Sequence, residues 1–133
     1  MTSKPDSTVP KEWIEIADRD LAFGKTSLKN NPRFLTQICF YFQQAAEKYL
    51  KAYIVAKKLP FKKVHSLPVL VNICRKKDAS FSQLEHYAKF LTEFYFEERY
   101  PEFEAPSKLT YDIAQKAQAA TQKIRAFVLN KLK

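Results

Sequence analysis

The sequence predicts an all-α protein, an up-and-down antiparallel four-helix bundle with an additional short helix. Its 133 residues are a common size for one domain with one core. A single glycine in the chain argues against hairpins and phosphate-cradling loops, which depend on glycine. Apolar residues also recur at helical spacing in long segments that short links join, as expected for a bundle.

The first helix is expected to follow a flexible tail of residues 1–9 and to end at the turn formed by residues 30–33. Ser7 or Thr8 is a suitable N-terminal cap. Gly24 falls within the apolar stripe, although a glycine inside a helix costs about 1 kcal/mol. We therefore expect a neighbouring helix or ring to approach closely there. The whole stripe consists of Trp13, Ala17, Leu21, Gly24 and Leu28.

The second helix, "FLTQICFYFQQAAEKYLKAYIVAKK", is apolar around most of its circumference and is predicted to be central. Glu47 and Lys51 in this helix have the spacing and order of an i,i+4 ion pair. They belong to a narrow polar stripe formed by Gln43, Gln44, Glu47, Lys48 and Lys51.

Three further helices are predicted. Ser66 is a plausible cap and Pro68 a tolerated first-turn residue for a short third helix. The fourth helix has two overlapping capping boxes in residues 80–85, and it ends at Tyr100 because Pro101 disfavours a helical residue before it. The last helix, "SKLTYDIAQKAQAATQKIRAFVLNKL", is expected to pack through Ile113, Ala117, Ala120, Ile124, Phe127 and Val128.

The net charge of +9 arises in one segment, because residues 48–77 contain nine basic and no acidic side chains. Elsewhere the charges balance. Such a segment would attract a nucleotide, nucleic acid or an acidic protein surface. A solvated face that binds nothing is the alternative. The nine are Lys48, Lys51, Lys57, Lys58, Lys62, Lys63, Arg75, Lys76 and Lys77.

Most catalytic and metal-binding patterns are absent from the sequence. It contains no HExxH, ExxH or nucleophile-elbow motif, and Cys39 and Cys74 form no CxxC. We therefore assign no catalytic and no metal-binding residue. His86 falls on the outer face of its helix, whereas His65 precedes a helix start beside lysines, where an anion could bind or where the ring could be structural. Since no 18-residue apolar run or signal-peptide pattern occurs, we expect a cytoplasmic protein.

Three segments occur in a characteristic order, namely "WIEIADRDL", then "FYFQQAAEKYLKAYIVAKKLPFKKVHSLPVLV" and later "YFEERYPEF". Together they resemble the HEPN (higher eukaryotes and prokaryotes nucleotide-binding) family. The resemblance covers about residues 11–130, so residues 10–133 are expected to form one HEPN domain. It implies a helical bundle that often forms a homodimer. Some members are metal-independent ribonuclease toxins with an Arg-x(4–6)-His motif, and others are noncatalytic partners of small nucleotidyltransferases.

This chain is similar to the type that lacks the ribonuclease motif. The positions five to seven residues after Arg99 are Glu104, Ala105 and Pro106, and RNA cleavage through the 2′-hydroxyl needs a proton-transfer group that histidine usually supplies. Arg99 could hold a phosphate, or it could pair with Glu98 or Glu102 as a structural residue. A ribonuclease that uses Arg99 with an unusual acid or base is the enzymatic alternative.

The resemblance therefore implies a noncatalytic HEPN protein that needs no cofactor. It is expected to bind a nucleotide, to work with a separately encoded minimal nucleotidyltransferase, or to do both, and a toxin-antitoxin or defence pair is the expected setting. RNA is a further candidate ligand, and no membrane interaction is expected. A protein-interaction module without nucleotide affinity is the remaining alternative. The candidate nucleotide-binding residues are Arg99, Tyr95, Tyr100, Lys48, Lys51, Gln44 and His65. Lys48, Lys51 and Gln44 are included because they match the family's polar stripe.

Overall fold

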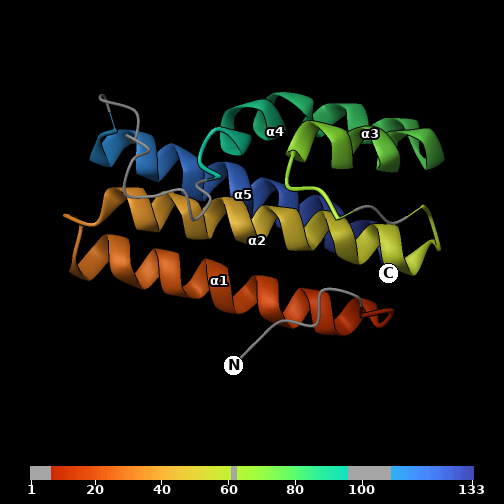
Figure 1. Cartoon of the computed structure of the whole chain (residues 1–133), viewed down its shortest axis with the longest axis horizontal. Coiled ribbons are helices and arrows are strands. Elements are labelled where there is room, and N and C mark those ends of the chain that lie inside the picture. The colour runs from red at the N-terminus through yellow and green to blue at the C-terminus, as the bar shows by residue number, and fades with distance from the viewer. Residues whose placement is uncertain (1–6, 61–62, 96–108) are drawn as a thin grey trace.

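The computed structural model describes residues 7–60, 63–95 and 109–133, and in these ranges it contains helices and no strand. The long helices α1, α2 and α5 lie alongside one another, and α3 and α4 pack as a further layer (Figure 1). The prediction of an all-α helical bundle is confirmed. The elements are α1 (Pro10–Asn30), α2 (Leu35–Ala56), α3 (Leu67–Lys77), the 3-10 helix η1 (Ala79–Leu84), α4 (Glu85–Thr92) and α5 (Tyr111–Lys131).

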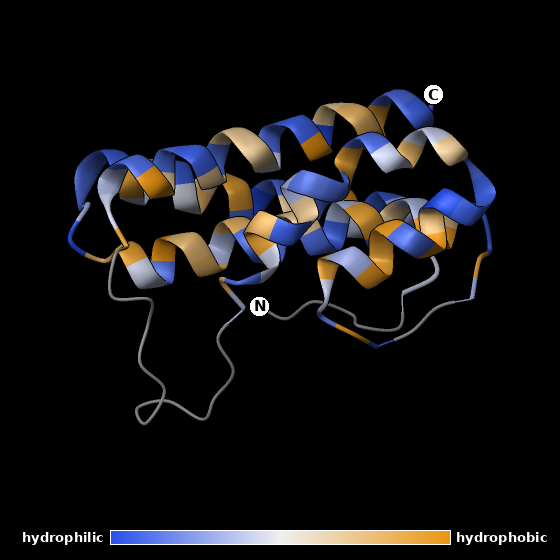
Figure 2. Cartoon of the chain, turned by 90° about the horizontal axis from the view of Figure 1, so that it is seen from above, coloured by the Kyte–Doolittle hydropathy of each residue, from blue (hydrophilic) through white to orange (hydrophobic). Residues whose placement is uncertain are grey.

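Helix α2 is the centre of the bundle, as its sequence predicts. It contacts α1, α3, α4 and α5, so nearly its whole circumference is covered. Phe42, Tyr49 and Ile54 are fully buried along it. Hydrophobic and hydrophilic residues alternate along the ribbons of the surrounding helices (Figure 2), as expected where each helix has one apolar face. The core therefore lies around α2.

Gly24 permits the close packing of α1 on α2. A Cβ atom at this position would lie 2.5 Å from Cε1 of the Phe42 ring, closer than such atoms approach. The predicted close approach is confirmed, and the other members of the α1 apolar stripe are buried as well. The glycine therefore allows an aromatic ring of the central helix to lie directly against the α1 backbone.

The start of α1 differs from the prediction. Val9 is the N-cap residue, and no side chain caps the helix, so the expected cap at Ser7 or Thr8 is wrong. Ser7 instead lies two residues earlier, where its hydroxyl accepts from the Val9 N–H at 3.1 Å and donates to Glu12 at 2.6 Å. Its carbonyl accepts from Trp13 Nε1 at 2.9 Å. Ser7 thus fixes the approach of the chain to α1 without satisfying the helix N–H groups.

The segment after α3 also differs from the prediction. Instead of one long helix with capping boxes, η1 leads into α4, which has eight residues and no side-chain cap. Asp78 caps η1, because its carboxylate accepts from the Ser80 N–H at 3.0 Å and from its hydroxyl at 2.6 Å. The capping boxes predicted at residues 80–85 are therefore wrong. The expected continuation to Tyr100 lies outside the described residues.

The predicted N-cap of α3 is confirmed. Ser66 is the N-cap of α3 and accepts from the Val69 N–H. Cys39 and Cys74 are buried free thiols, and burial raises the pKa of each to about 12. Among the helices that the structure describes, none has the length and apolar character needed to cross a membrane.

Candidate functional site

The polar stripe of α2 lies inside the protein. Because α1, α3 and α4 surround this helix, Gln43 is fully buried and Glu47, Lys48 and Lys51 are 3%, 9% and 6% exposed. Charged side chains are rarely buried to this extent unless other groups pair with them. The contacts of these residues therefore determine what the stripe does.

Glu47 is the centre of the stripe. Its Oε2 lies 2.7 Å from Lys51 Nζ, and both of its carboxylate oxygens lie 3.1 Å from His65 Nδ1. Gln43 Nε2 donates more weakly to Oε1, at 3.4 Å. An ionised carboxylate can only accept hydrogen bonds, so this arrangement places the ring hydrogen of His65 on Nδ1. The buried carboxylate thus fixes the orientation of the imidazole.

His65 and Tyr95 form a stacked pair at the surface. Their rings are 4.2 Å apart between centroids and 11° from parallel, and the His65 side chain is 46% exposed. His65 lies just before α3, and Tyr95 lies just after α4. The Leu67 N–H donates to Thr92 Oγ1 at 3.1 Å, which ties the start of α3 to the end of α4. Two chain segments are thereby held together beside the polar stripe.

Lys48 and Gln44 extend the network towards α1. Lys48 Nζ lies 2.9 Å from Asp20 Oδ2 and 3.1 Å from Gln44 Oε1, and Gln44 Nε2 donates to Gln43 Oε1 at 2.9 Å. Burial raises the pKa of Asp20, while Lys48 opposes this shift. A continuous chain of polar contacts therefore runs from Asp20 on α1, through α2, to His65.

The structure brings five of the predicted site residues to this network. Lys51 and His65 contact Glu47, and Tyr95 stacks on His65. Gln44 and Lys48 lie on the α1 side of the network. Arg99 and Tyr100 lie outside the described residues. The residues that the prediction of the site omitted are Glu47, Gln43 and Asp20.

A sequence signal was available for two of these omitted residues. Gln43, Glu47 and Lys51 follow one another at i,i+4 spacing, so they share one face of α2. No comparable signal points to Asp20, because its partner Lys48 is 28 residues away in the sequence. Among the described residues, no group of three or more His, Cys, Asp or Glu side chains could hold a metal ion.

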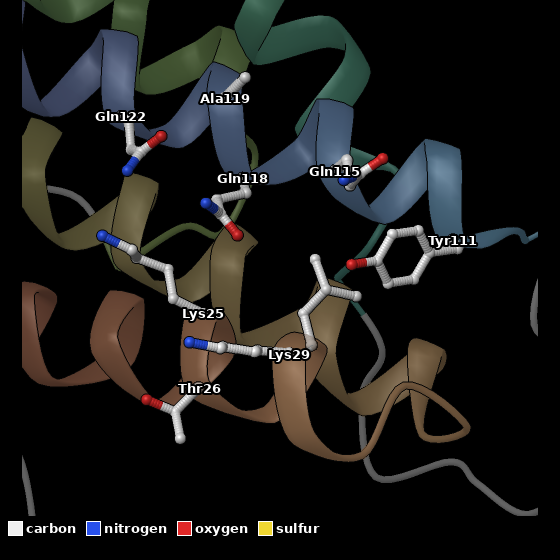
Figure 3. Close-up of a pocket in the computed structure, with 9 residues that line it drawn as sticks. Lys25, Thr26, Lys29, Tyr111, Gln115, Gln118, Ala119 and Gln122 are labelled. Atoms are coloured by element: carbon white, nitrogen blue, oxygen red, sulfur yellow. The ribbon is translucent and has the colours of Figure 1, made fainter.

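A cavity of about 520 Å³ lies elsewhere, between α1 and α5. Figure 3 shows the Lys25 and Lys29 side chains on its α1 wall and glutamine side chains on its α5 wall. None of the five described candidate site residues lines it. The His65–Tyr95 site is therefore separate from this cavity.

The fold and the site define a helical-bundle protein in which a buried, charge-paired polar network ends at a half-exposed His–Tyr stack. The HEPN domain model matches residues 10–132, nearly the whole sequence, and the chain belongs to the HEPN family.

Two solved structures are similar over most of their length. The Thermus thermophilus protein TT1696 is 28% identical, with a TM-score of 0.77 over 92% of this chain and 97% of that chain. An archaeal HEPN homologue is 24% identical, with a TM-score of 0.74 over 94% of this chain and 98% of that chain. A comparison with curated proteins finds no match.

Proposed function

We propose that this HEPN protein binds a nucleotide at the His65–Tyr95 stack and does not cleave it. The observation that carries the proposal is this half-exposed stack, which the buried Glu47 carboxylate holds in place. Aromatic side chains bind bases by stacking, whatever the base, because every base has a π-face. With Nδ1 turned to the carboxylate, Nε2 is the ring nitrogen that remains for a ligand.

The buried lysines support this site indirectly. Lys51 pairs with Glu47, and Lys48 pairs with Asp20, so the two positive and two negative formal charges cancel. In this proposal Lys48, Lys51 and Gln44 therefore hold the network in position, and they do not neutralise a phosphate themselves. Arg99 supplies the phosphate contact through its guanidinium group, and Tyr100 supplies a second stacking ring.

The proposal extends to partners that the family resemblance implies. The protein acts as a homodimer and works with a separately encoded minimal nucleotidyltransferase, which contributes the transfer chemistry, in a toxin-antitoxin or defence pair. Support comes from the HEPN domain match over residues 10–132 and from the sequence after Arg99, which has no histidine at the ribonuclease spacing.

Calorimetric titration with ATP, GTP, CTP and UTP tests the binding. We expect Tyr95→Ala to weaken binding about tenfold, because a base stacked on an aromatic side chain contributes about 1–3 kcal/mol. Tyr111→Ala is the matched control, since this 44% exposed tyrosine lies at the start of α5 and lines the other cavity. Because the proposed site contacts phosphate groups, nucleotide binding should also weaken as the salt concentration rises from about 50 to 200 mM. Absence of binding to all four nucleotides would favour an interaction module.

A ribonuclease is the second candidate function, and one specific contact favours it. The Glu47 carboxylate orients His65 through Nδ1, an arrangement in which a histidine can act as a general base through Nε2. Purified protein incubated with RNA separates the two candidates. The binding proposal predicts no cleavage, whereas cleavage that His65→Ala and Arg99→Ala both abolish would establish the ribonuclease.

A further inference from the structure

A second cavity, of about 400 Å³, lies between α4 and α5. Its volume is within the range of small-molecule sites, which are mostly apolar with a few polar groups. Helix α4 contributes aromatic side chains, and α5 contributes alanines and lysines. The lining residues are His86, Tyr87, Phe90, Lys116, Ala119, Ala120 and Lys123.

The apolar part of this cavity suits a flat group. Tyr87 and Phe90 are half-buried, and the rings of His86 and Tyr87 are 3.9 Å apart between centroids. The Phe94 ring packs edge-on against the Phe90 ring, with 5.3 Å between the two centroids, and so supports the aromatic side of the cavity. Opposite them, Ala119 and Ala120 extend little from α5. A planar ring could therefore lie between the aromatic wall and the α5 backbone.

The charged part of the cavity is positive. Lys116 and Lys123 are exposed on α5, and their spacing of two turns places them about 10 Å apart along the helix axis. Lys116 Nζ lies 5.7 Å from the Phe90 ring centroid, so one cation already lies next to the apolar wall. Within the described part of the chain, no acidic side chain lines this cavity. An anionic group on a bound ring would therefore meet two lysines and no carboxylate of the described lining.

We propose that this cavity binds a planar aromatic anion, such as an aromatic carboxylate or sulfonate. The aromatic wall and alanine floor select the flat body, and Lys116 or Lys123 selects the negative charge. The cavity shares no residue with the described His65–Tyr95 network, so this binding does not depend on the proposed nucleotide binding.

Fluorescence titration with 1-anilinonaphthalene-8-sulfonate tests the proposal. Lys116→Gln/Lys123→Gln is expected to raise the dissociation constant about fivefold, because it removes both solvated cations. Lys76→Gln/Lys77→Gln is the charge-matched control, since these exposed lysines flank a different apolar cavity with Leu59, Pro60 and Ile73. It is expected to change the constant less than about twofold. Equal weakening by both double variants would overturn the proposal.

Two further measurements separate the shape of the cavity from its charge. Ala119→Leu fills part of the cavity at an exposed helical position that tolerates leucine, so it should strongly reduce the fluorescence increase while urea unfolding stays unchanged. Because Ala119 also lines the cavity between α1 and α5, Lys25→Gln/Lys29→Gln, which changes that other cavity and not this one, should leave sulfonate binding intact. The neutral N-phenyl-1-naphthylamine should bind the wild type and the Lys116→Gln/Lys123→Gln variant equally. Unchanged sulfonate binding by Ala119→Leu would place the probe elsewhere and refute the site. Tyr95→Ala should leave sulfonate binding intact.

Discussion

Two groups of lysines from the same basic segment have opposite environments. Lys48 and Lys51 are buried in α2 and paired with carboxylates, whereas Lys57, Lys58, Lys76 and Lys77 are exposed. In the sequence all of them belong to one stretch without an acidic residue. The comparison shows that a run of positive charge can contain both internal structural cations and solvated ones.

Helix position explains the difference. Lys48 and Lys51 lie in the part of α2 that α1 covers, where Asp20 and Glu47 can reach them. Lys57 is the C-cap of α2 and Lys58 follows it with a φ of 55°, outside the helix. Lys76 and Lys77 lie in the last turn of α3, where a cation interacts favourably with the helix dipole. The exposed charge therefore gathers at helix ends.

The largest expected effect comes from removing the carboxylate of the buried group. Glu47→Ala should lower the free energy of unfolding by about 3 kcal/mol, because removing one partner of a buried ion pair leaves the other charge uncompensated. The same change removes the acceptor of His65 Nδ1. Urea unfolding followed by circular dichroism measures the loss.

A double variant tests whether uncompensated charge is the cause. Glu47→Leu/Lys51→Met replaces the pair with apolar side chains of similar size, which is often tolerated better than breaking a pair. We expect it to be more stable than Glu47→Ala. If the double variant were less stable than Glu47→Ala, the attraction between Glu47 and Lys51 would itself stabilise the fold. An uncompensated charge would then not explain the loss in Glu47→Ala.

The second prediction concerns Lys48 and the pH dependence of stability. Lys48→Met should cost about 2 kcal/mol at neutral pH, since it leaves the Asp20 carboxylate, at 16% side-chain exposure, without its cation. Burial already raises the pKa of Asp20, and removing Lys48 raises it further. A raised folded-state pKa means that the folded protein gains stability as pH falls through that pKa. The loss of stability in Lys48→Met relative to the wild type should therefore be smaller when urea unfolding is measured at mildly acidic pH. A loss that is the same at neutral and acidic pH would contradict this account.

The sequence predicts the bundle well, because helical periodicity is a local signal. The central position of α2, the close approach at Gly24 and the Ser66 cap all follow from neighbouring residues. The 3-10 helix η1 was missed because the Asp78 carboxylate binds Ser80 ahead of the predicted capping boxes. The start of this helical segment therefore depends on which nearby side chain caps it, Asp78 or one of the serines of the predicted capping boxes.

The site was harder to predict because its contacts are distant in the sequence. Glu47 meets His65 across 18 residues, and Lys48 meets Asp20 across 28. The polar stripe identified the side chains, but not whether they face solvent or each other. Only the packing of α1 and the chain before α3 against α2 determines that these cations are internal.

A third prediction tests an ion pair near the exposed lysines. Asp78 accepts from Ser80 and lies 2.9 Å from Lys131 Nζ, and these contacts lower its pKa from 3.8 to about 2. A lowered folded-state pKa gives stability that is present above the ordinary pKa and lost as pH falls through the lowered value. Asp78→Asn should therefore flatten the loss of stability between about pH 4 and pH 2, measured by thermal unfolding. If Asp78→Asn lost stability between about pH 4 and pH 2 as steeply as the wild type, other carboxylates would be the cause of the acid destabilisation.

The smallest expected effect comes from the exposed lysines themselves. Lys76→Gln/Lys77→Gln should change the free energy of unfolding by less than about 0.5 kcal/mol, because both ammonium groups are solvated and only the helix-dipole interaction is lost. Urea unfolding at low and high salt checks this, since salt screens the dipole term. A loss comparable to that of Lys48→Met would mean that exposure does not separate the two groups. In that case the contrast between internal and solvated lysines would fail.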